Sequence, residues 1–280
     1  MASALAARLS TGIVLIVAIL AALFLLPTPG FGVVVLLIVL AAADEWAQLI
    51  GLRHAGRAVF VGVTLAAGAA LLWTGAEHGF HAIVLAVCGA ATLFWIGIGL
   101  PSVLRNWQPA SVMARAVFAF VALEAAFVAI VACQARSPWF ALAAMAIVWI
   151  ADTAAYFAGR RFGRRKLAPQ ISPGKTWEGA YGAIVAVTVY ALLLLPPASR
   201  AAFAGSLDPV IVVSWVVFAI VLAALSIVGD LHESLLKRRA GVKDSGALLP
   251  GHGGVLDRTD ALLAAMPPVA LAAAALLGTP

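Results

Sequence analysis

The chain has 280 residues, of which 64% are hydrophobic and only 11% are charged, and its formal net charge is +6. This composition excludes an ordinary soluble domain, in which about a quarter of the residues are charged. It indicates a polytopic membrane protein, because each helix that crosses a bilayer needs about 20 apolar residues and several such helices fit in this length. We therefore expect one integral-membrane domain over residues 1–280.

Apolar runs bounded by glycine, proline or charged residues follow one another along the chain, and each is long enough to suggest a membrane span. Their bounds are roughly 9–26, 31–50, 57–73, 80–100, 114–133, 138–158, 178–195, 209–229 and 259–278. The first run is longer than a signal-peptide core and lacks a small-residue cleavage site, so we expect it to remain as the first helix. The predicted fold class is all-α, a polytopic membrane helix bundle of about nine transmembrane helices.

The basic residues predict the orientation of this bundle. If the N-terminus is cytoplasmic, sixteen of the 18 lysines and arginines fall in cytoplasmic segments, and only Arg136 and Arg200 lie outside. Such asymmetry is typical of membrane proteins. The net charge then reflects topology and an anionic membrane face or substrate, and no nucleic-acid partner is needed to explain it. Cys88 and Cys133 lie in apolar runs and are expected to be small core residues, without a disulfide or metal site.

Carboxylates within the spans are costly in lipid, so Glu124 and Asp152 are expected to face an aqueous cavity. For Glu124, a hydrogen-bonded structural role between helices remains an equal alternative. Asp152 is favoured as a site residue because a polar segment follows it. Asp44 and Glu45, at the end of the second run, are explained by the membrane interface and are not assigned to the site.

The polar segment after the sixth run contains Ser-Pro-Gly-Lys-Thr at positions 172–176. Serine is a common helix cap, proline suits a first helical turn, and a lysine beside the free N–H groups of a helix start forms an anion site. We therefore expect a helix to begin here, with Ser172 and Lys175 facing a phosphate. A Walker nucleotide loop is excluded, because it needs glycine where this chain has Pro169.

The densest chemistry lies between Asp230 and Asp260, where five acidic and five basic residues occur within 31 positions. On a helix, one face would carry Asp230, Glu233, Ser234 and Lys237, and a second would carry Asp257 and Asp260. Clustered glycines between these faces indicate close backbone approach to a ligand. Carboxylates without a His/Cys cluster favour Mg²⁺, and basic side chains beside Mg²⁺ are typical of phosphoryl or nucleotidyl transfer.

This block resembles the signature of the phosphatidate cytidylyltransferase family, also called CDP-diacylglycerol synthases. The similar pattern is Ser234-x-x-Lys237-Arg238-x₄-Lys243-Asp244-Ser245-Gly246-x₂-Leu249-Pro250-Gly251-His252-Gly253-Gly254-x₂-Asp257-Arg258-x-Asp260. The segment from Asp152 to Glu178 also resembles the second polar segment of that family. Specific similarity thus covers about 110 residues, while the first 150 match only as a hydrophobic pattern.

The resemblance implies a multi-pass enzyme of the bacterial inner membrane, with cytoplasmic catalytic loops, that converts CTP and phosphatidate to CDP-diacylglycerol and pyrophosphate for phospholipid synthesis. It implies Mg²⁺, and leaves room for a second, monovalent cation such as K⁺ and for a homodimer. Residues 1–150 would then be membrane scaffold, and 151–280 would carry the catalytic spans and loops.

The resemblance also implies roles for individual residues. The catalytic residues would be Asp230, Lys243, Asp244, Asp257 and Asp260, with Asp230 and Asp257 as metal ligands. The substrate-binding residues would be Asp152, Ser172, Lys175, Ser234, Lys237, Arg238, His252, Gly253, Gly254 and Arg258. His252 is equally explained as a packing or hydrogen-bonding residue.

Two alternatives stay open at this point. A CTP-dependent polyprenol or phytol-type lipid kinase would share these broad features. An ion-coupled transporter would also carry carboxylates within its spans, but it is less favoured because it does not need a lysine- and glycine-rich surface loop and no pair of broken helices is visible in related halves.

Overall fold

The structure, a computed structural model, describes the backbone of residues 2–202, 204–249, 251 and 253–278, with side chains from residue 12 onward. Over these residues the long helical segments are α1 (Ala2–Leu25), α2 (Thr28–Leu49), α3 (His54–His78), α7 (Val112–Arg136), α8 (Pro138–Phe162), α9 (Trp177–Ala202), α10 (Pro209–Ala240) and α11 (Leu256–Leu277). A further continuous segment consists of α4 (His81–Ile83), η1 (Val84–Cys88), α5 (Gly89–Phe94), η2 (Trp95–Gly99) and α6 (Leu100–Leu104), in which η1 and η2 are π-helical turns.

These segments confirm the predicted all-α bundle of about nine helices. Within the described residues, eight helical segments are long and apolar enough to cross a membrane, and α1 adds the apolar stretch Gly12–Leu25. The helices extend beyond the apolar runs that predicted them, because a helix continues through polar residues as long as its backbone hydrogen bonds are satisfied. The largest extension is at α10, which runs on from the apolar run to Ala240.

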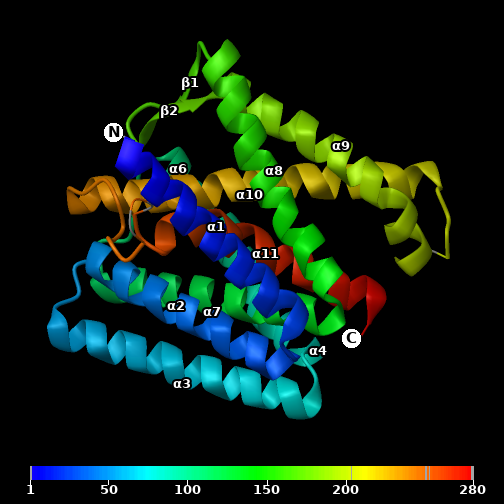
Figure 1. Cartoon of the computed structure of the whole chain (residues 1–280), viewed down its shortest axis with the longest axis horizontal. Coiled ribbons are helices and arrows are strands. Elements are labelled where there is room, and N and C mark those ends of the chain that lie inside the picture. Colours follow the sequence, from blue (N-terminus) through cyan, green and yellow to red (C-terminus); the bar gives the residue numbers. More distant parts are fainter. Residues whose placement is uncertain (1, 203, 250, 252, 279–280) are drawn as a thin grey trace.

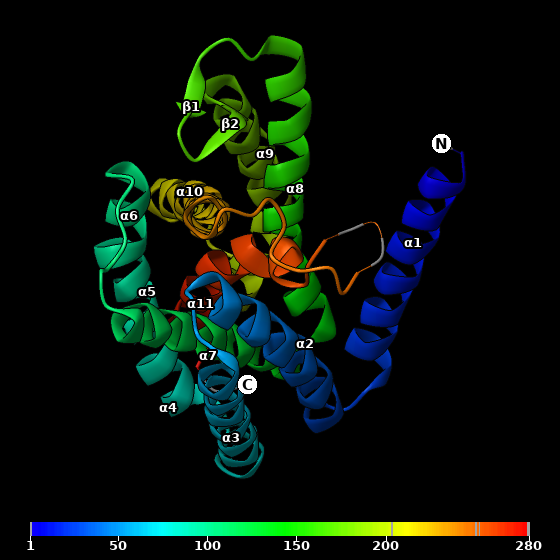
Figure 2. The same cartoon turned by 90° about the vertical axis from the view of Figure 1, so that its left-hand side faces the viewer.

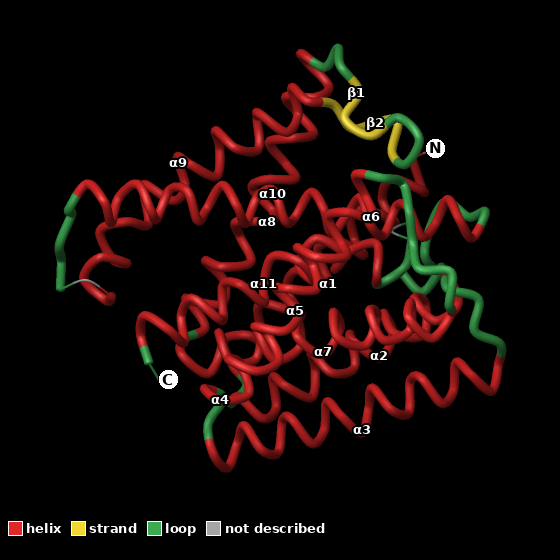
Figure 3. Tube along the Cα trace, turned by 180° about the vertical axis from the view of Figure 1, so that it is seen from behind, coloured by secondary structure: helices red, strands yellow, loops and turns green. Residues whose placement is uncertain are grey.

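Successive helices run in alternating directions, so the connections 50–53, 105–111 and 163–176 and the described residues 241–249 and 253–255 lie at the same end of the bundle (Figures 1 and 3). We call this the loop end. The C-terminal end of α11 and the turn that follows α9 lie at the opposite end. The two polar segments of the sequence therefore share one end of the molecule, as the distribution of basic residues predicts.

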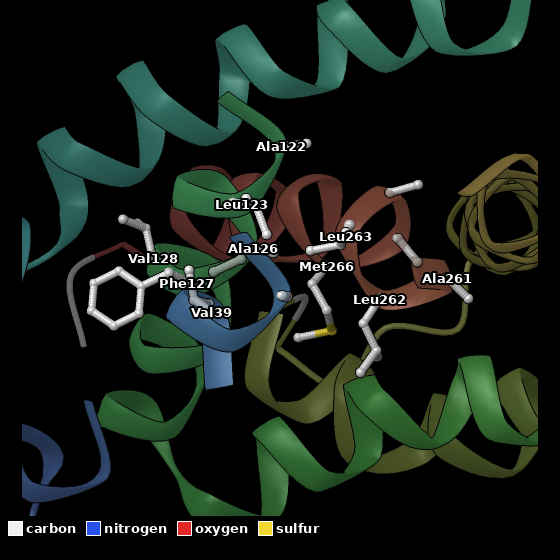
Figure 4. Close-up of a cluster of buried hydrophobic side chains, with 14 of the residues drawn as sticks. Val39, Ala122, Leu123, Ala126, Phe127, Val128, Ala261, Leu262, Leu263 and Met266 are labelled. Atoms are coloured by element: carbon white, nitrogen blue, oxygen red, sulfur yellow. The ribbon is translucent and has the colours of Figure 1, made fainter. Parts of the chain in front are cut away.

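The centre of the bundle is formed by α2, α7 and α11. More than half of the apolar stretch is buried in these three helices, and a third or less in the other spans. Val39 of α2, Phe127 of α7 and Met266 of α11 lie together in this core (Figure 4). Cys88 and Cys133 are free and buried, which confirms their prediction as core residues.

Helices α8 and α9 pack through small residues and carry the loop-end hairpin. A Cβ atom at Gly182 of α9 would lie 2.4 Å from the Cβ of Ala158 in α8, so only glycine permits this contact. Since lipid chains are as apolar as leucine, close backbone approach of this kind is a main source of helix association in membranes. The closely packed helices α8 and α9 therefore hold the two ends of the segment that connects them.

That segment is an antiparallel hairpin of β1 (Lys166–Ala168) and β2 (Ser172–Thr176). The prediction that a helix begins at Ser172 is therefore wrong. The backbone of residues 172–176 is extended and pairs with β1, and the helix begins only at Trp177. The capping function belongs to Thr176, whose Oγ1 accepts a hydrogen bond of 3.1 Å from the N–H of Gly179.

Helix α1 is joined to the bundle mainly at its C-terminal end. The Gln134 side chain of α7 donates to the carbonyls of Leu23 (3.4 Å) and Leu26 (3.2 Å), and the rings of Phe24 and Trp139 lie 4.7 Å apart. Towards its N-terminal end α1 diverges from the other helices (Figure 2).

Candidate active site

The site is built where α10 crosses α11. A Cβ atom at Gly229 would lie 2.6 Å from the carbonyl oxygen of Asp260 and 3.2 Å from the Cα of Ala261, so the two helices can approach this closely only at glycine. The crossing places Asp230 of α10 beside Asp260 of α11. The predicted helical spacing on α10 is confirmed, and the Ser234 hydroxyl donates to Oδ1 of Asp230 at 3.4 Å.

The hairpin contributes Lys175 to this crossing. Its Nζ lies 2.7 Å from Oδ2 of Asp230. The carboxylates of Asp152 on α8 and Asp260 on α11 lie within electrostatic reach of both members of this pair. Arg238 adds a second tie to the hairpin, because its Nε donates to the carbonyl of Ile171 at 3.2 Å. The two polar segments of the sequence thus form one site.

Two turns further along α10, Lys237 lies between two carboxylates. Its Nζ is 2.6 Å from Oδ1 of Asp257 and 2.5 Å from Oε2 of Glu233. All three side chains are nearly buried, with exposed fractions of 12% for Lys237, 8% for Asp257 and 4% for Glu233. Glu233 was not among the predicted site residues, although its position four residues before Lys237 is the spacing of a helical ion pair.

Asp257 is also held by the loop that joins the two helices. Its Oδ2 accepts from the backbone N–H groups of Ser245 (3.0 Å) and Gly254 (2.8 Å), and its own N–H donates to the Ser245 hydroxyl (3.3 Å). The glycines predicted to approach a ligand approach these groups of the protein itself. A Cβ atom at Gly253 would lie 2.7 Å from Oδ2 of Asp257.

A second residue that sequence analysis missed is Glu45, near the end of α2. It is buried, and its carboxylate accepts from the N–H of Val255 (3.0 Å), the N–H of Leu256 (2.8 Å) and the hydroxyl of Ser245 (2.8 Å). The membrane interface, which explained its charge in the sequence, does not account for these contacts. No local signal could have found it, since its partners lie 200 to 211 positions away in the sequence.

The remaining predicted residues lie around this centre or outside it. Lys243, Asp244 and Arg258 are exposed at the loop end, Ser172 is half-buried on β2, and His252 lies outside the described residues. Glu124 is buried against Gly68 of α3, and neither of its oxygens has a hydrogen-bond partner among the described residues. The contacts described for Glu124 therefore give it a place in the core of α3 and α7.

The donor set of the site fits a hard divalent cation. Within the described residues, no three acidic, histidine or cysteine side chains are already arranged to hold a metal ion. Asp230 and Asp257 instead each contact a lysine ammonium. Both carboxylates therefore lie where a positive charge is stabilised. Oε1 of Glu233 is buried without a hydrogen-bond partner, so acceptor capacity remains. Oxygen-only ligands of this kind suit Mg²⁺.

Comparison with known proteins agrees with this chemistry. The sequence model described as "Cytidylyltransferase family" matches residues 6–276. The chain is 37% identical over 278 residues to the phosphatidate cytidylyltransferase of Pseudomonas aeruginosa, covering 93% of each chain. It is 32% identical over 283 residues to the protein of that name from Haemophilus influenzae, covering 93% of this chain and 95% of the relative. The corresponding protein of Bacillus subtilis is 43% identical over 124 residues, covering 44% of this chain and 43% of the relative.

Proposed function

Because the chain belongs to the cytidylyltransferase family, we propose that it transfers the CMP group of CTP to phosphatidate, giving CDP-diacylglycerol and pyrophosphate. It is a membrane enzyme whose substrates are a nucleotide and a lipid. The observation that carries this proposal is the ion pair between Lys175 and Asp230, which joins the two polar segments into one site at the end of an apolar bundle. A lipid kinase and an ion-coupled transporter are not favoured by the relatives that the chain matches.

In this reaction, a phosphate oxygen of phosphatidate forms a bond to the α-phosphorus of CTP, and the bond from that phosphorus to the bridging oxygen breaks to release pyrophosphate. The phosphatidate monoester has a second pKa of about 6 by analogy with phosphorylated side chains, so it is already a nucleophilic anion near neutral pH. The protein therefore needs no strong base. Its task is to align the phosphate of phosphatidate, the α-phosphate of CTP and the leaving pyrophosphate, and to neutralise their charge.

The basic side chains are placed for this task. Lys175 and Lys237 line the buried part of the site, and Arg258 and Lys243 are exposed at its edge. The backbone N–H groups at the start of α11 do not take part, because those of residues 254–257 already donate to Asp257, Glu45 and Ser245. At this helix, phosphate must therefore be bound by the basic side chains, which can exchange their carboxylate partners for phosphate oxygens.

We propose Mg²⁺ as the cofactor, with Asp230 and Asp257 as its ligands and with room for a monovalent cation such as K⁺. Bound Mg²⁺ supplies charge neutralisation of the reacting phosphates. Lys175 and Lys237 would have to release these carboxylates to the metal. Asp260 and Asp244 would orient the same lysines or the metal. The support for this assignment is the all-oxygen donor set at the crossing of α10 and α11.

We further propose that the loop end faces the cytoplasm of a bacterium and that the protein resides in the inner membrane. The support for this orientation is that the connections at the loop end are rich in lysine and arginine. Cysteines placed at positions 200 and 241 of a variant without native cysteines should then react with an impermeant reagent from opposite sides of sealed vesicles. Reaction of both from the same side would contradict this orientation. We also expect the protein to form a homodimer.

Turnover with labelled CTP tests the proposed reaction. Purified protein in phosphatidate-containing micelles is given CTP labelled at the α-phosphate or, in a parallel reaction, at the γ-phosphate. Cytidylyl transfer places only the α-label in lipid and releases the γ-label as pyrophosphate. With a polyprenol added to the micelles, appearance of the γ-label in lipid would instead identify a CTP-dependent kinase, and no labelled lipid in either reaction would contradict both enzymatic functions.

A further inference from the structure

We propose that Glu45 is a positioning residue for the reaction: it holds Ser245, Val255 and the first turn of α11 so that Asp257 is presented in one orientation. This inference rests on the proposed function for its effect on turnover, but its structural part can be tested without turnover. It assigns a role at the site to α2, a helix in the half of the chain that the sequence predicts to be scaffold only.

The contacts form a continuous path from Glu45 to Asp257. Oε2 of Glu45 accepts from the Ser245 hydroxyl at 2.8 Å, and that hydroxyl oxygen accepts from the N–H of Asp257 at 3.3 Å. The N–H of Ser245 in turn donates to Oδ2 of Asp257 at 3.0 Å. Ser245 is thus bound to Glu45 through its side chain and to Asp257 through both its side chain and its backbone.

Glu45 also fixes the start of α11 directly. The first N–H groups of a helix have no acceptor within the helix and are usually capped by a side chain from the residues just before it. Here the N–H groups of Val255 and Leu256 donate to the two oxygens of Glu45, which comes from another helix. Because Asp257 is the next residue, these bonds fix the position of its backbone, while its carboxylate is held by the N–H groups of Ser245 and Gly254.

The fit around the Glu45 carboxylate is close on the side of the loop. A Cβ atom at Gly254 would lie 2.3 Å from Oε2 of Glu45, and one at Gly246 would lie 2.4 Å from Oε1. Two glycines of the loop are therefore needed to admit this carboxylate. This gives the glycine-rich composition of the loop a structural purpose that does not depend on a bound ligand.

The variant Glu45→Gln tests the role with little change in volume. Whichever way the amide turns, its NH₂ group faces a backbone N–H of Val255 or Leu256, so one buried donor loses its acceptor. We expect kcat to fall roughly 10- to 100-fold, with the KM of CTP and of phosphatidate changed by less than about threefold. Trypsin cleavage of the folded protein after Lys243 should become about tenfold faster, because the loop opens more often.

A matched control lies at the adjacent position. Asp44 carries the same charge on the same helix end, but its carboxylate is half exposed and binds Arg57. Asp44→Asn should leave kcat within about twofold and the cleavage rate unchanged, since a surface ion pair contributes little. Glu45→Asp keeps the charge but is one methylene shorter, so it should behave like the glutamine variant.

A second variant keeps the test decisive if Glu45→Gln does not fold. Ser245→Ala removes only one hydroxyl, and we expect about a tenfold lower kcat. In the double variant, the losses should combine to less than their product because both belong to one path of contacts. Wild-type kcat and cleavage rate in Glu45→Gln, wild-type kcat in Ser245→Ala, or full activity in Glu45→Asp would overturn the proposal. The cleavage rate remains informative even if the wild-type protein proves not to transfer CMP.

Discussion

Asp257 and Asp230 each contact a lysine in the site, and the structure holds these two aspartates in different ways. Asp257 is buried with Lys237, accepts two backbone hydrogen bonds and belongs to a network that reaches α2. Asp230 is more exposed, and its closest contacts are with Lys175 of the hairpin and with the Ser234 hydroxyl at 3.4 Å. One aspartate is fixed by backbone and the other by side chains alone.

The difference teaches that the site has a preformed half and an adjustable half. Backbone hydrogen bonds of buried groups cannot be exchanged for water without cost, so Asp257 keeps one orientation. The contact of Lys175 with Asp230 crosses from a surface hairpin to a helix and can be exchanged for substrate phosphate. We expect changes at the first half to affect both stability and rate, and changes at the second to affect rate alone.

The largest effect is expected from removing the two carboxylate charges. Asp257→Asn and Asp230→Asn should each lower kcat by about 10³-fold or more across a Mg²⁺ titration, because electrostatic stabilisation of the reacting phosphates is lost. Only Asp257→Asn should also lower the free energy of unfolding, by about 2 kcal/mol, since its new amide faces buried donors. Thermal unfolding in detergent measures the second effect.

Full activity of either variant at ordinary Mg²⁺ would remove that residue from the proposed metal ligands. Full activity of both would rule out the metal-dependent mechanism. Equal loss of stability in the two variants would contradict the division into a preformed and an adjustable half.

The next largest effect concerns the lysines. Lys237→Met leaves Glu233 and Asp257 buried without their counter-ion, and should destabilise the fold by about 3 kcal/mol. Lys175→Met removes a partly exposed contact, and should leave the unfolding temperature unchanged while raising the KM of CTP by about tenfold. Parallel unfolding and steady-state measurements would show this contrast. A stable Lys237→Met protein would show that the buried pair does not hold the loop.

The smallest effect is expected at Asp152, which is exposed on α8 and contributes only through its charge near Asp230 and Lys175. Asp152→Asn should lower kcat by about tenfold while the protein still inserts and unfolds as wild type. Steady-state rates at saturating CTP measure it. Unchanged activity would return Asp152 to a structural role.

The helices could be predicted from the sequence because each span is a local property: a bilayer requires about 20 apolar residues in succession. The helical faces of α10 and α11 were predictable for the same reason. The strand at Ser172 to Thr176 was not, because the capping signal of Ser172 competes with pairing to β1 and a later cap at Thr176. Glu45 could not be found at all, since its role depends on contacts with residues far along the chain.

The contact between Glu45 and Leu256 has a consequence for how the protein is made. Its partners are 211 positions apart, so at 5–20 residues per second the ribosome needs roughly 10 to 40 seconds to supply the second after the first. During this interval α2 is already in the membrane with a carboxylate that has no partner. Its place at the loop end lets water hydrate that carboxylate until α11 arrives. Closure of the active site is thus one of the last events of biosynthesis, and a chain that stops before residue 256 has every earlier helix but cannot complete it.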